Sequence, residues 1–568
     1  MPTSLNSTEA AKLSSGELPS GGLPPGELPS EGAVPQRMES EKIARSAGIA
    51  SAAVMASRLT GLLRESFMAH MFGAGLENDA FGIGFRIPNL TRDLFAEGAL
   101  SSAFVPIFTE YLNKKSKEEA VRLANLVSTA LLMIVGTVCA LGVMLAPWLV
   151  EIFAQGFHKV PGKFELAVTM TRIMFPFLLR VALAAQAMGV LNACNRFGVP
   201  ATASTFFNLG SVGFGTLLGW VVGPALGFSH IVGMAWGVVL GGALQLLWQV
   251  PEMWKLGFSF GLAIDWSHPG LRRILALMVP AIIGSAATQI NVMVNTNLAS
   301  DMPGAVSWLG YAFRFMQLPI GIFGVTIASA TLPSISKSAA LGNFDEFRKT
   351  LSQSMAMLFL LTIPSSVGLA VLGRSVIGSI YQSGAFKVSD TEAAALALSC
   401  YAIGLAGYAA LKVITPAYYA LNDSKTPMYV SFFSIAINYA MANSMTKFAG
   451  LGHAGLALST STVAIAGFVI LFTLLRNRMD GIYGRALIKT VVQVSVASAS
   501  MGLVVWASSR FLEAQLGVGR SAHIVVLMVS IPAGVSVYYY LCRWFGVEEL
   551  DLAVRSITGG VARRFGKR

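Results

Sequence analysis

Long apolar stretches separated by short polar breaks run along most of this 568-residue chain. From about Ile43 onward, each stretch is long enough to cross roughly 30 Å of hydrocarbon as an α-helix. The pattern predicts an all-α polytopic membrane protein of about fourteen helices, over residues 44–70, 79–110, 121–150, 164–192, 199–221, 231–254, 271–299, 304–333, 349–373, 391–421, 427–447, 453–475, 486–508 and 521–543.

The first 42 residues have a different composition. The stretch SGELPSGGLPPGELPSEG repeats Gly, Pro, Glu, Leu and Ser and holds too few apolar residues to form a core. It also lacks the basic start and apolar core of a signal peptide. Residues 1–42 are therefore predicted to be a disordered extension.

An internal repeat predicts how the helices are grouped. AFVPIFTEYLNKKSKEEAVRL resembles ATLPSISKSAALGNFDEFRKTL, and the same displacement of 227 residues relates Pro106 to Pro333, Gln155 to Gln382, Asn195 to Asn422 and Pro200 to Pro427. About six helices separate equivalent points, so both halves enter the membrane in the same direction. This predicts two parallel six-helix lobes, residues 43–255 and 270–478, around a central cavity. Two further helices lie in residues 485–545.

The charge pattern predicts the orientation. Hydrophobic residues make up 54% of the chain and charged residues only 12%, whereas soluble domains carry about 25% charged residues. The net charge is +12, and most basic residues lie in short loops on one predicted side. That distribution follows the positive-inside rule and gives no indication of nucleic-acid binding. It predicts that both termini are cytoplasmic, with residues 546–568 as a basic cytoplasmic tail.

Four arginines lie inside predicted membrane spans: Arg58, Arg64, Arg92 and Arg314. An arginine at the bilayer centre costs roughly 2.5–3.5 kcal/mol, so these side chains should face water, a counter-charge or an anion. A purely structural alternative is that each snorkels to an interface or pairs internally. The guanidinium fork suits the oxygens of a diphosphate, since it forms bidentate, charge-assisted hydrogen bonds.

Two positions are predicted to bend the helices that carry these arginines. Arg58 and Arg64 lie about 9 Å apart along a helix and about 120° around it, so both reach one cavity more easily if the helix loosens at Gly61. Pro88 is predicted to kink the next helix. Beside Arg92, that helix carries a polar stripe of Arg86, Asn89, Asp93 and Glu97.

Sequence motifs for catalysis are missing from the chain. The four cysteines and six histidines are scattered without metal-ligand spacing, and there is no nucleophile elbow, phosphate-binding loop or dinucleotide fingerprint. No metal, no cofactor and no enzymatic activity are therefore predicted.

Several strings resemble one membrane-protein family. ASRLTGLLRESFMAHMFGAG, NDAFGIGFRIPNLTRDLFAEGALSSAFVPIFTEY, NRFGVP, LPSISKSAALGN and DSKTP are similar to the MviN/MurJ lipid II flippases of the multidrug/oligosaccharidyl-lipid/polysaccharide (MOP) exporter superfamily. The resemblance implies a flippase of the bacterial inner membrane. It would move undecaprenyl-diphosphate-linked disaccharide pentapeptide (lipid II) to the outer leaflet by alternating access, for peptidoglycan synthesis. The cell-wall synthesis machinery is the protein partner that this role implies.

The resemblance also assigns residues. It places diphosphate binding on Arg58, Arg64, Arg92 and Arg314, and functional or gating roles on Asp79 and Glu97, and it implies that the last two helices hold the polyprenyl tail. In two places the chain departs from the family pattern. Phe313 precedes Arg314 where relatives often have an acid, and Asn295 replaces a sodium-ligating aspartate of some relatives. Dependence on membrane potential rather than sodium is therefore predicted.

Other functional classes remain open at this stage. Another MOP-superfamily exporter, of lipid-linked polysaccharide or of drugs, is an alternative, but a multidrug cation antiporter would favour an acidic cavity. A membrane-embedded glycosyl or phosphoryl transferase would favour clustered aspartates or histidines near one interface, and the sequence has no such cluster.

Overall fold

The computed structural model describes residues 33–92, 100–479, 481 and 484–551. Within these ranges the chain forms helices joined by turns and short loops, and no β-strand is present. The all-α prediction is confirmed. Glu97 and Asp93 lie outside the described residues.

The first lobe and its connections contain α1 (Ala33–Phe72), α2 (Leu76–Arg92), α3 (Ser101–Lys114), α4 (Lys117–Met144), α5 (Ala146–Ala154), the 3-10 helix η2 (Gln155–Lys159), α6 (Lys163–Met174), α7 (Phe177–Ala193), α8 (Gly198–Thr216), the π-helix η3 (Leu217–Val222), α9 (Gly223–Leu226), α10 (His230–Leu247) and α11 (Val250–Lys255).

The rest of the chain contains α12 (Pro269–Ser300), α13 (Ala305–Pro319), the π-helix η4 (Ile320–Val325), α14 (Thr326–Ala340), α15 (Phe344–Tyr381), α16 (Val388–Ala420), α17 (Lys425–Asn443), the π-helix η5 (Ser444–Phe448), α18 (Gly452–Arg478), α19 (Gly484–Leu516) and α20 (Arg520–Trp544).

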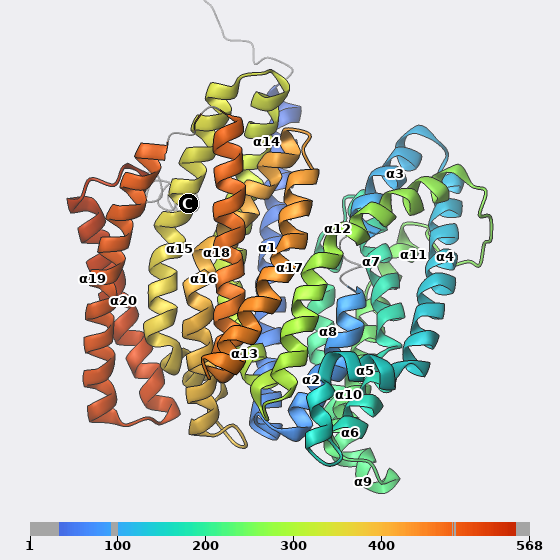
Figure 1. Ribbon diagram of the computed structural model, residues 1–568. Helices are drawn as coiled ribbons and strands as arrows, with labels where there is room; N and C mark the ends of the chain where they lie inside the picture. Colours follow the sequence, from blue (N-terminus) through green and yellow to red (C-terminus); the bar gives the residue numbers. More distant parts are fainter. Residues whose placement is uncertain (1–32, 93–99, 480, 482–483, 552–568) are drawn as a thin grey trace, which may run out of the picture.

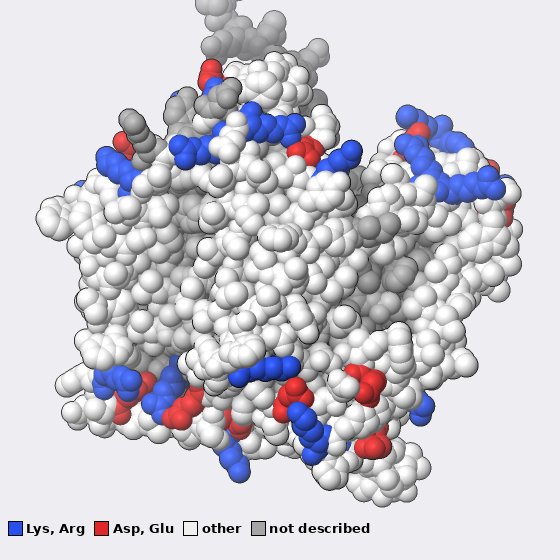
Figure 2. Space-filling view, viewed as in Figure 1, with Lys and Arg blue, Asp and Glu red and all other residues white. Residues whose placement is uncertain are grey.

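On the face shown in Figure 2, a broad band with few charged residues lies between two charged ends. Within the described residues, ten helical segments are long and apolar enough to cross a membrane, and some of them join two or more consecutive labelled helices. The remaining predicted spans fall on α1, α2 with α3, α12, and α17 with η5, which are not among these ten. The chain is a multi-pass membrane protein, and the count of fourteen spans stays a prediction.

Several backbone features recur at positions separated by the 227-residue displacement of the sequence repeat. Asn195 and Asn422 are the two non-glycine residues with positive φ in the described part of the chain, at 59° and 58°. Each follows the end of a helix, where Asn tolerates the left-handed conformation. The caps of α4 and α15 also match, because Ser116 and Asn343 each accept a hydrogen bond from the backbone N–H three residues later. The π-helices η3 and η5 begin at the same displacement.

The two groups of helices lie side by side with α12 between them (Figure 1). Helix α12 packs on α3 and α5 on one side and on α17 on the other, while α19 and α20 pack on the outer side of α15. The start of α1 and the end of α20 lie at one end of the molecule. We call this the basic end, because it carries the turns with the predicted cytoplasmic Lys and Arg residues. The predicted lobe boundaries stay predictions.

The described structure extends into both predicted terminal segments. Helix α1 begins at Ala33, so it includes residues 33–42 of the predicted extension. They follow the glycine-rich repeat, and their proline, Pro35, sits in the first helical turn, where no N–H bond is lost. At the other terminus, Val547 and Leu550 are buried against α15, α19 and α20. The predicted tail therefore begins as part of the packed structure, because these apolar residues have a hydrophobic surface to cover.

Candidate functional site between the lobes

Helix α1 carries the first two predicted arginines along the boundary between the lobes. It packs mainly on α8 of the first lobe and also contacts α15 of the second. The Arg64 side chain is only 13% exposed and its Cζ lies 5.3 Å from the ring centroids of both Phe85 and Phe207. Two aromatic faces therefore support this guanidinium by cation–π attraction.

Glu65 joins the two lobes through its carboxylate. Its Oε1 lies 3.7 Å from Arg64 Nη2 and forms an ion pair with Arg314 Nη2 from α13. The Tyr381 hydroxyl, at the end of α15, donates to Glu65 Oε2 at 3.5 Å. A carboxylate that is 11% exposed needs such partners, because an unpaired buried charge is strongly destabilising.

The other predicted arginines lie close to this pair. The guanidinium of Arg58 packs against Gly321 in the π-helix η4, where a β-carbon would lie 2.8 Å from Arg58 Nη2. Arg92, the last residue of α2, and Arg314 are both close enough for their positive charges to act on Arg64. We call Arg58, Arg64, Arg92, Arg314 and Glu65 the arginine cluster.

The cluster has more donors than its own carboxylate can accept. Among the described residues, Glu65 is the one carboxylate that pairs with both Arg64 and Arg314. The Arg314 side chain is 49% exposed and Arg58 is also exposed, so solvent-accessible donors face the region between the lobes. This arrangement suits a ligand with several negatively charged oxygens, of which a diphosphate is one.

Sequence reasoning missed Glu65 as a site residue. The sequence did contain an indication of this role, because a carboxylate next to Arg64 within an apolar span needs a partner of its own. Arg86 was placed in a polar stripe but given no role. Its Nη1 donates to Thr296 Oγ1 of α12 at 2.7 Å, which ties α2 to the helix between the lobes.

Asp79 lies in a second, separate cluster at the end opposite the basic end. It is fully buried at the start of α2, and its Oδ2 accepts from Lys163 Nζ of α6 at 2.7 Å and from the backbone N–H of Gly304 at 2.9 Å. Its Oδ1 accepts from the N–H and hydroxyl of Ser307 at 3.0 and 2.6 Å. Asp79 thus caps α13 of the second lobe from the first lobe. We call Asp79, Lys163, Gly304 and Ser307 the Asp79 cluster.

Further contacts close the lobes at this same end. The Lys159 ammonium pairs with Asp301 at 2.7 Å, and the backbone N–H of Ala385 donates to the carbonyl of His70 at 2.8 Å. The structure therefore shows a state in which the lobes are joined opposite the basic end.

Asn295 belongs to a polar network within the second lobe. Its Nδ2 donates to Thr460 Oγ1 at 2.8 Å, and its Oδ1 accepts from Asn438 Nδ2 at 3.0 Å. Ser459 donates in turn to Asn438 Oδ1 at 3.3 Å. The Asn295 amide is therefore satisfied by protein partners on α17 and α18.

The two predicted helix bends have no direct test in the structure. Helix α1 continues as an α-helix through Gly61, and α2 continues through Pro88. Beside Gly61, the Nδ2 of Asn208 donates to the carbonyl of Ser57 at 3.1 Å, so α8 satisfies a backbone group of α1. Bends at Gly61 and Pro88 stay predictions.

Substituting Gly321 by leucine should lower transport about ten- to hundredfold, because the new side chain would displace the Arg58 guanidinium from its packed position. The measurement is transport by purified protein in vesicles. Gly310→Ala is the matched control, since Gly310 lies on the adjoining helix α13 and a β-carbon there meets no atom within 4 Å. Equal activity of both variants would show that the position of Arg58 is unimportant.

The fold is similar to that of solved transporters of the MOP superfamily. An inward-facing multidrug resistance MATE transporter of that superfamily superposes with a TM-score of 0.63 at 15% identity, over 76% of this chain and 98% of the transporter. A solved lipid II flippase MurJ in an inward closed conformation matches more closely. Its TM-score is 0.71 at 26% identity, over 87% of this chain and 98% of that structure.

Sequence comparison gives the family. The model of the lipid II flippase MurJ family matches residues 68–527. The lipid II flippase MurJ of Burkholderia cenocepacia is 36% identical over 466 residues, covering 80% of this chain and 88% of the relative. A probable lipid II flippase MurJ of Vibrio cholerae is 32% identical over 524 residues, covering 90% and 98%. The chain belongs to the MurJ family of lipid II flippases.

Proposed function

We propose that this chain moves lipid II from the inner to the outer leaflet of the bacterial inner membrane, and that it does so as a transporter without enzymatic activity. The observation that carries the proposal is the arginine cluster, in which arginines of both lobes converge on one carboxylate between them. Membership of the MurJ family supports the same substrate.

Glu65 serves as an internal substitute for the anion in this mechanism. In the structure, the Glu65 carboxylate pairs with Arg64 and Arg314. An arriving diphosphate offers more negative charge and more oxygens than one carboxylate, so it displaces Glu65 from the exposed Arg314 first. Because Arg64 and Arg314 belong to different lobes, the bound diphosphate contacts both lobes at once.

The Asp79 cluster holds the outer end closed while the substrate loads. We assign the basic end to the cytoplasm by the positive-inside rule, with both termini on that side. Loading from the cytoplasm then requires the opposite end to be shut, which the Asp79 cluster and the Lys159–Asp301 pair achieve. Release requires these contacts to break as the lobes rock about the arginine cluster. We retain the gating role of Glu97 as a proposal from the family resemblance.

Helices α19 and α20 are proposed to guide the polyprenyl tail along the outside of α15. These two helices expose several large apolar side chains, namely Leu503, Trp506, Met528, Val535 and Tyr540. Such a surface allows the tail to remain in lipid while only the charged head group passes between the lobes.

The decisive test of the substrate is genetic replacement of a lipid II flippase. A bacterium depleted of its own MurJ should regain growth when this chain is expressed, and spheroplasts should again expose lipid II on the outer leaflet. A multidrug cation exporter of the same superfamily would not restore growth. The surplus of arginine between the lobes argues against that alternative, because a cation would be repelled.

Transport should depend on membrane potential and little on sodium. Moving a diphosphate outward carries about two negative charges, and an inside-negative potential favours this by roughly 2.3 kcal/mol per charge per 100 mV. Asn295 stands where a carboxylate would help bind sodium, and its amide already has two protein partners. The measurement is flipping in vesicles under an imposed potassium diffusion potential, with and without a sodium gradient. Transport that follows the sodium gradient at zero potential would contradict the prediction.

A further inference from the structure

An extended segment between α11 and α12 runs along the outer side of α4 (Figure 1). It has no helical structure between residues 258 and 265. Two side chains of α4 support its backbone, because Gly261 N–H donates to Asn125 Oδ1 and Ala263 N–H donates to Thr129 Oγ1, both at 3.0 Å. Non-helical backbone next to lipid is tolerated only where its polar groups are satisfied.

The position of the segment places it at the boundary between head groups and hydrocarbon. Asn125 and Thr129 lie about 12 and 18 Å along α4 from its first residue, Lys117, at the basic end. The side chains of Leu262 and Ile264 are 83% and 69% exposed. Beside a helix that spans the membrane, such side chains face lipid acyl chains.

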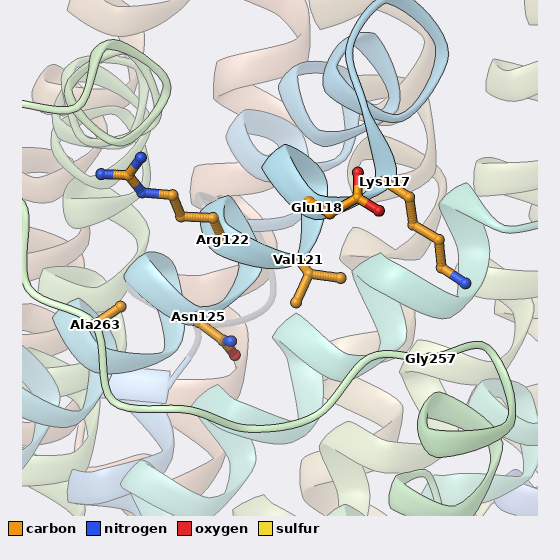
Figure 3. A pocket seen from close by; sticks show the side chains of 7 residues that line it. All are labelled: Lys117, Glu118, Val121, Arg122, Asn125, Gly257 and Ala263. Carbon is orange, nitrogen blue, oxygen red and sulfur yellow. The ribbon is translucent and has the colours of Figure 1, made fainter.

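A pocket of about 530 Å³ lies where this segment meets the first turns of α4. Its lining consists of Lys117, Glu118, Val121, Arg122, Asn125, Gly257 and Ala263. Figure 3 shows Lys117 and Arg122 pointing to opposite sides, with Val121 and Asn125 between them. The volume suits a small ligand.

The charges in the pocket are unequally engaged. Arg122 pairs with Asp265 at 3.3 Å and with Glu119 at 4.0 Å, so its charge is already balanced. Lys117 packs against the backbone of Gly257 and forms no ion pair within 4 Å among the described residues, and the same holds for Glu118. The pocket therefore holds one cation and one anion that form no ion pair among the described residues, although the Glu118 carboxylate accepts hydrogen bonds from Ser116 and from its own backbone.

We propose that this pocket binds the head group of a membrane phospholipid that carries an ammonium next to its phosphate. Lys117 Nζ and Asn125 Nδ2 donate to the phosphate, since Asn125 Oδ1 is already used by Gly261. Glu118 accepts from the ammonium, and the acyl chains lie against Leu262 and Ile264. A purely anionic head group matches less well, because the available charges of Lys117 and Glu118 sum to zero.

The experiment titrates delipidated, full-length protein in detergent with phosphatidylethanolamine and counts bound lipid by native mass spectrometry. Lys117→Ala should lower the affinity for the most tightly bound lipid about tenfold, which is the loss expected for one charge-assisted hydrogen bond. Glu118→Ala should lower the affinity for phosphatidylethanolamine more than the affinity for phosphatidylglycerol. Both side chains are exposed, so the variants should keep the melting temperature of the parent protein.

Lys349→Ala is the matched control. Lys349 is exposed in the second turn of α15, at the repeat position of Arg122, and it lines no part of this pocket. Equal lipid affinity of Lys117→Ala and Lys349→Ala would show that the lipid does not bind in this pocket. Tighter binding of phosphatidylglycerol than of phosphatidylethanolamine to the parent protein would overturn the ammonium assignment. Displacement of the lipid by inorganic phosphate at equal concentration would overturn the assignment to a lipid.

Discussion

Alanine at Arg314 is expected to abolish rescue of flippase-depleted cells and to reduce flipping in vesicles at least about a hundredfold. A bidentate, charge-assisted pair with a phosphate is worth about 3 kcal/mol or more when desolvated. Arg314 also brings the second lobe to the ligand, so its loss removes one side of the binding site. Arg314→Lys should recover only part of the activity, because an ammonium supplies a charge without the planar fork.

A double variant separates ligand binding from simple ion pairing. If Arg314 only neutralises Glu65, then removing both charges in Glu65→Gln with Arg314→Ala should restore transport. If Arg314 binds the diphosphate, the double variant should stay inactive. Arg510→Ala is the control for the loss of an arginine, because Arg510 is exposed near the end of α19. Membrane abundance is measured for each variant by immunoblot.

Alanine at Asp79 is expected to lower the free energy of unfolding by about 3 to 5 kcal/mol and to abolish transport. The Lys163 side chain is 2% exposed, so removing its partner leaves a buried, uncompensated charge. The N–H groups of Gly304 and Ser307 also lose their acceptor. Thermal unfolding of purified protein measures the loss of stability, and complementation measures the loss of transport.

The exposed pair at the same end of the molecule is the matched control for Asp79. Lys159 and Asp301 also join the two lobes, but their side chains are 65% and 46% exposed. Lys159→Ala should therefore lower the free energy of unfolding by no more than about 1 kcal/mol. Combining Asp79→Ala with Lys163→Met should recover much of the stability, since no buried charge remains. Equal losses for Asp79→Ala and Lys159→Ala would contradict the role of burial.

The repeat and the helical fold could be predicted because each depends on local sequence. Apolar runs of about twenty residues predict membrane spans whatever surrounds them. The turn at Asn195 and Asn422 recurs with the same left-handed backbone, because the short sequences around each Asn favour the same helix ending. The start of α1 was predicted less well, since composition alone did not separate the glycine-rich repeat from the helix-forming residues after it.

The partners of the charged residues could not be predicted in the same way. Arg64 and Arg314 were found as costly residues in apolar spans, but their shared partner Glu65 was not. Glu65 and Arg314 lie far apart in the sequence, and they meet only because α1 and α13 face each other across the lobes. Lys163 likewise meets its partner only in the fold, where it is buried against Asp79 of another helix.

The amino-acid sequence is enough to identify a helical membrane protein with an internal repeat and with arginines that must avoid lipid. The cost of placing a charge in hydrocarbon is a property of the residue and its depth, so it can be read from hydropathy. In contrast, the folded structure was needed to show which charges pair, which end of the molecule is closed and where solvent reaches the arginines. These depend on the rotation of each helix and on how the lobes meet, because an ion pair forms only when two side chains from distant segments come within a few ångströms of each other.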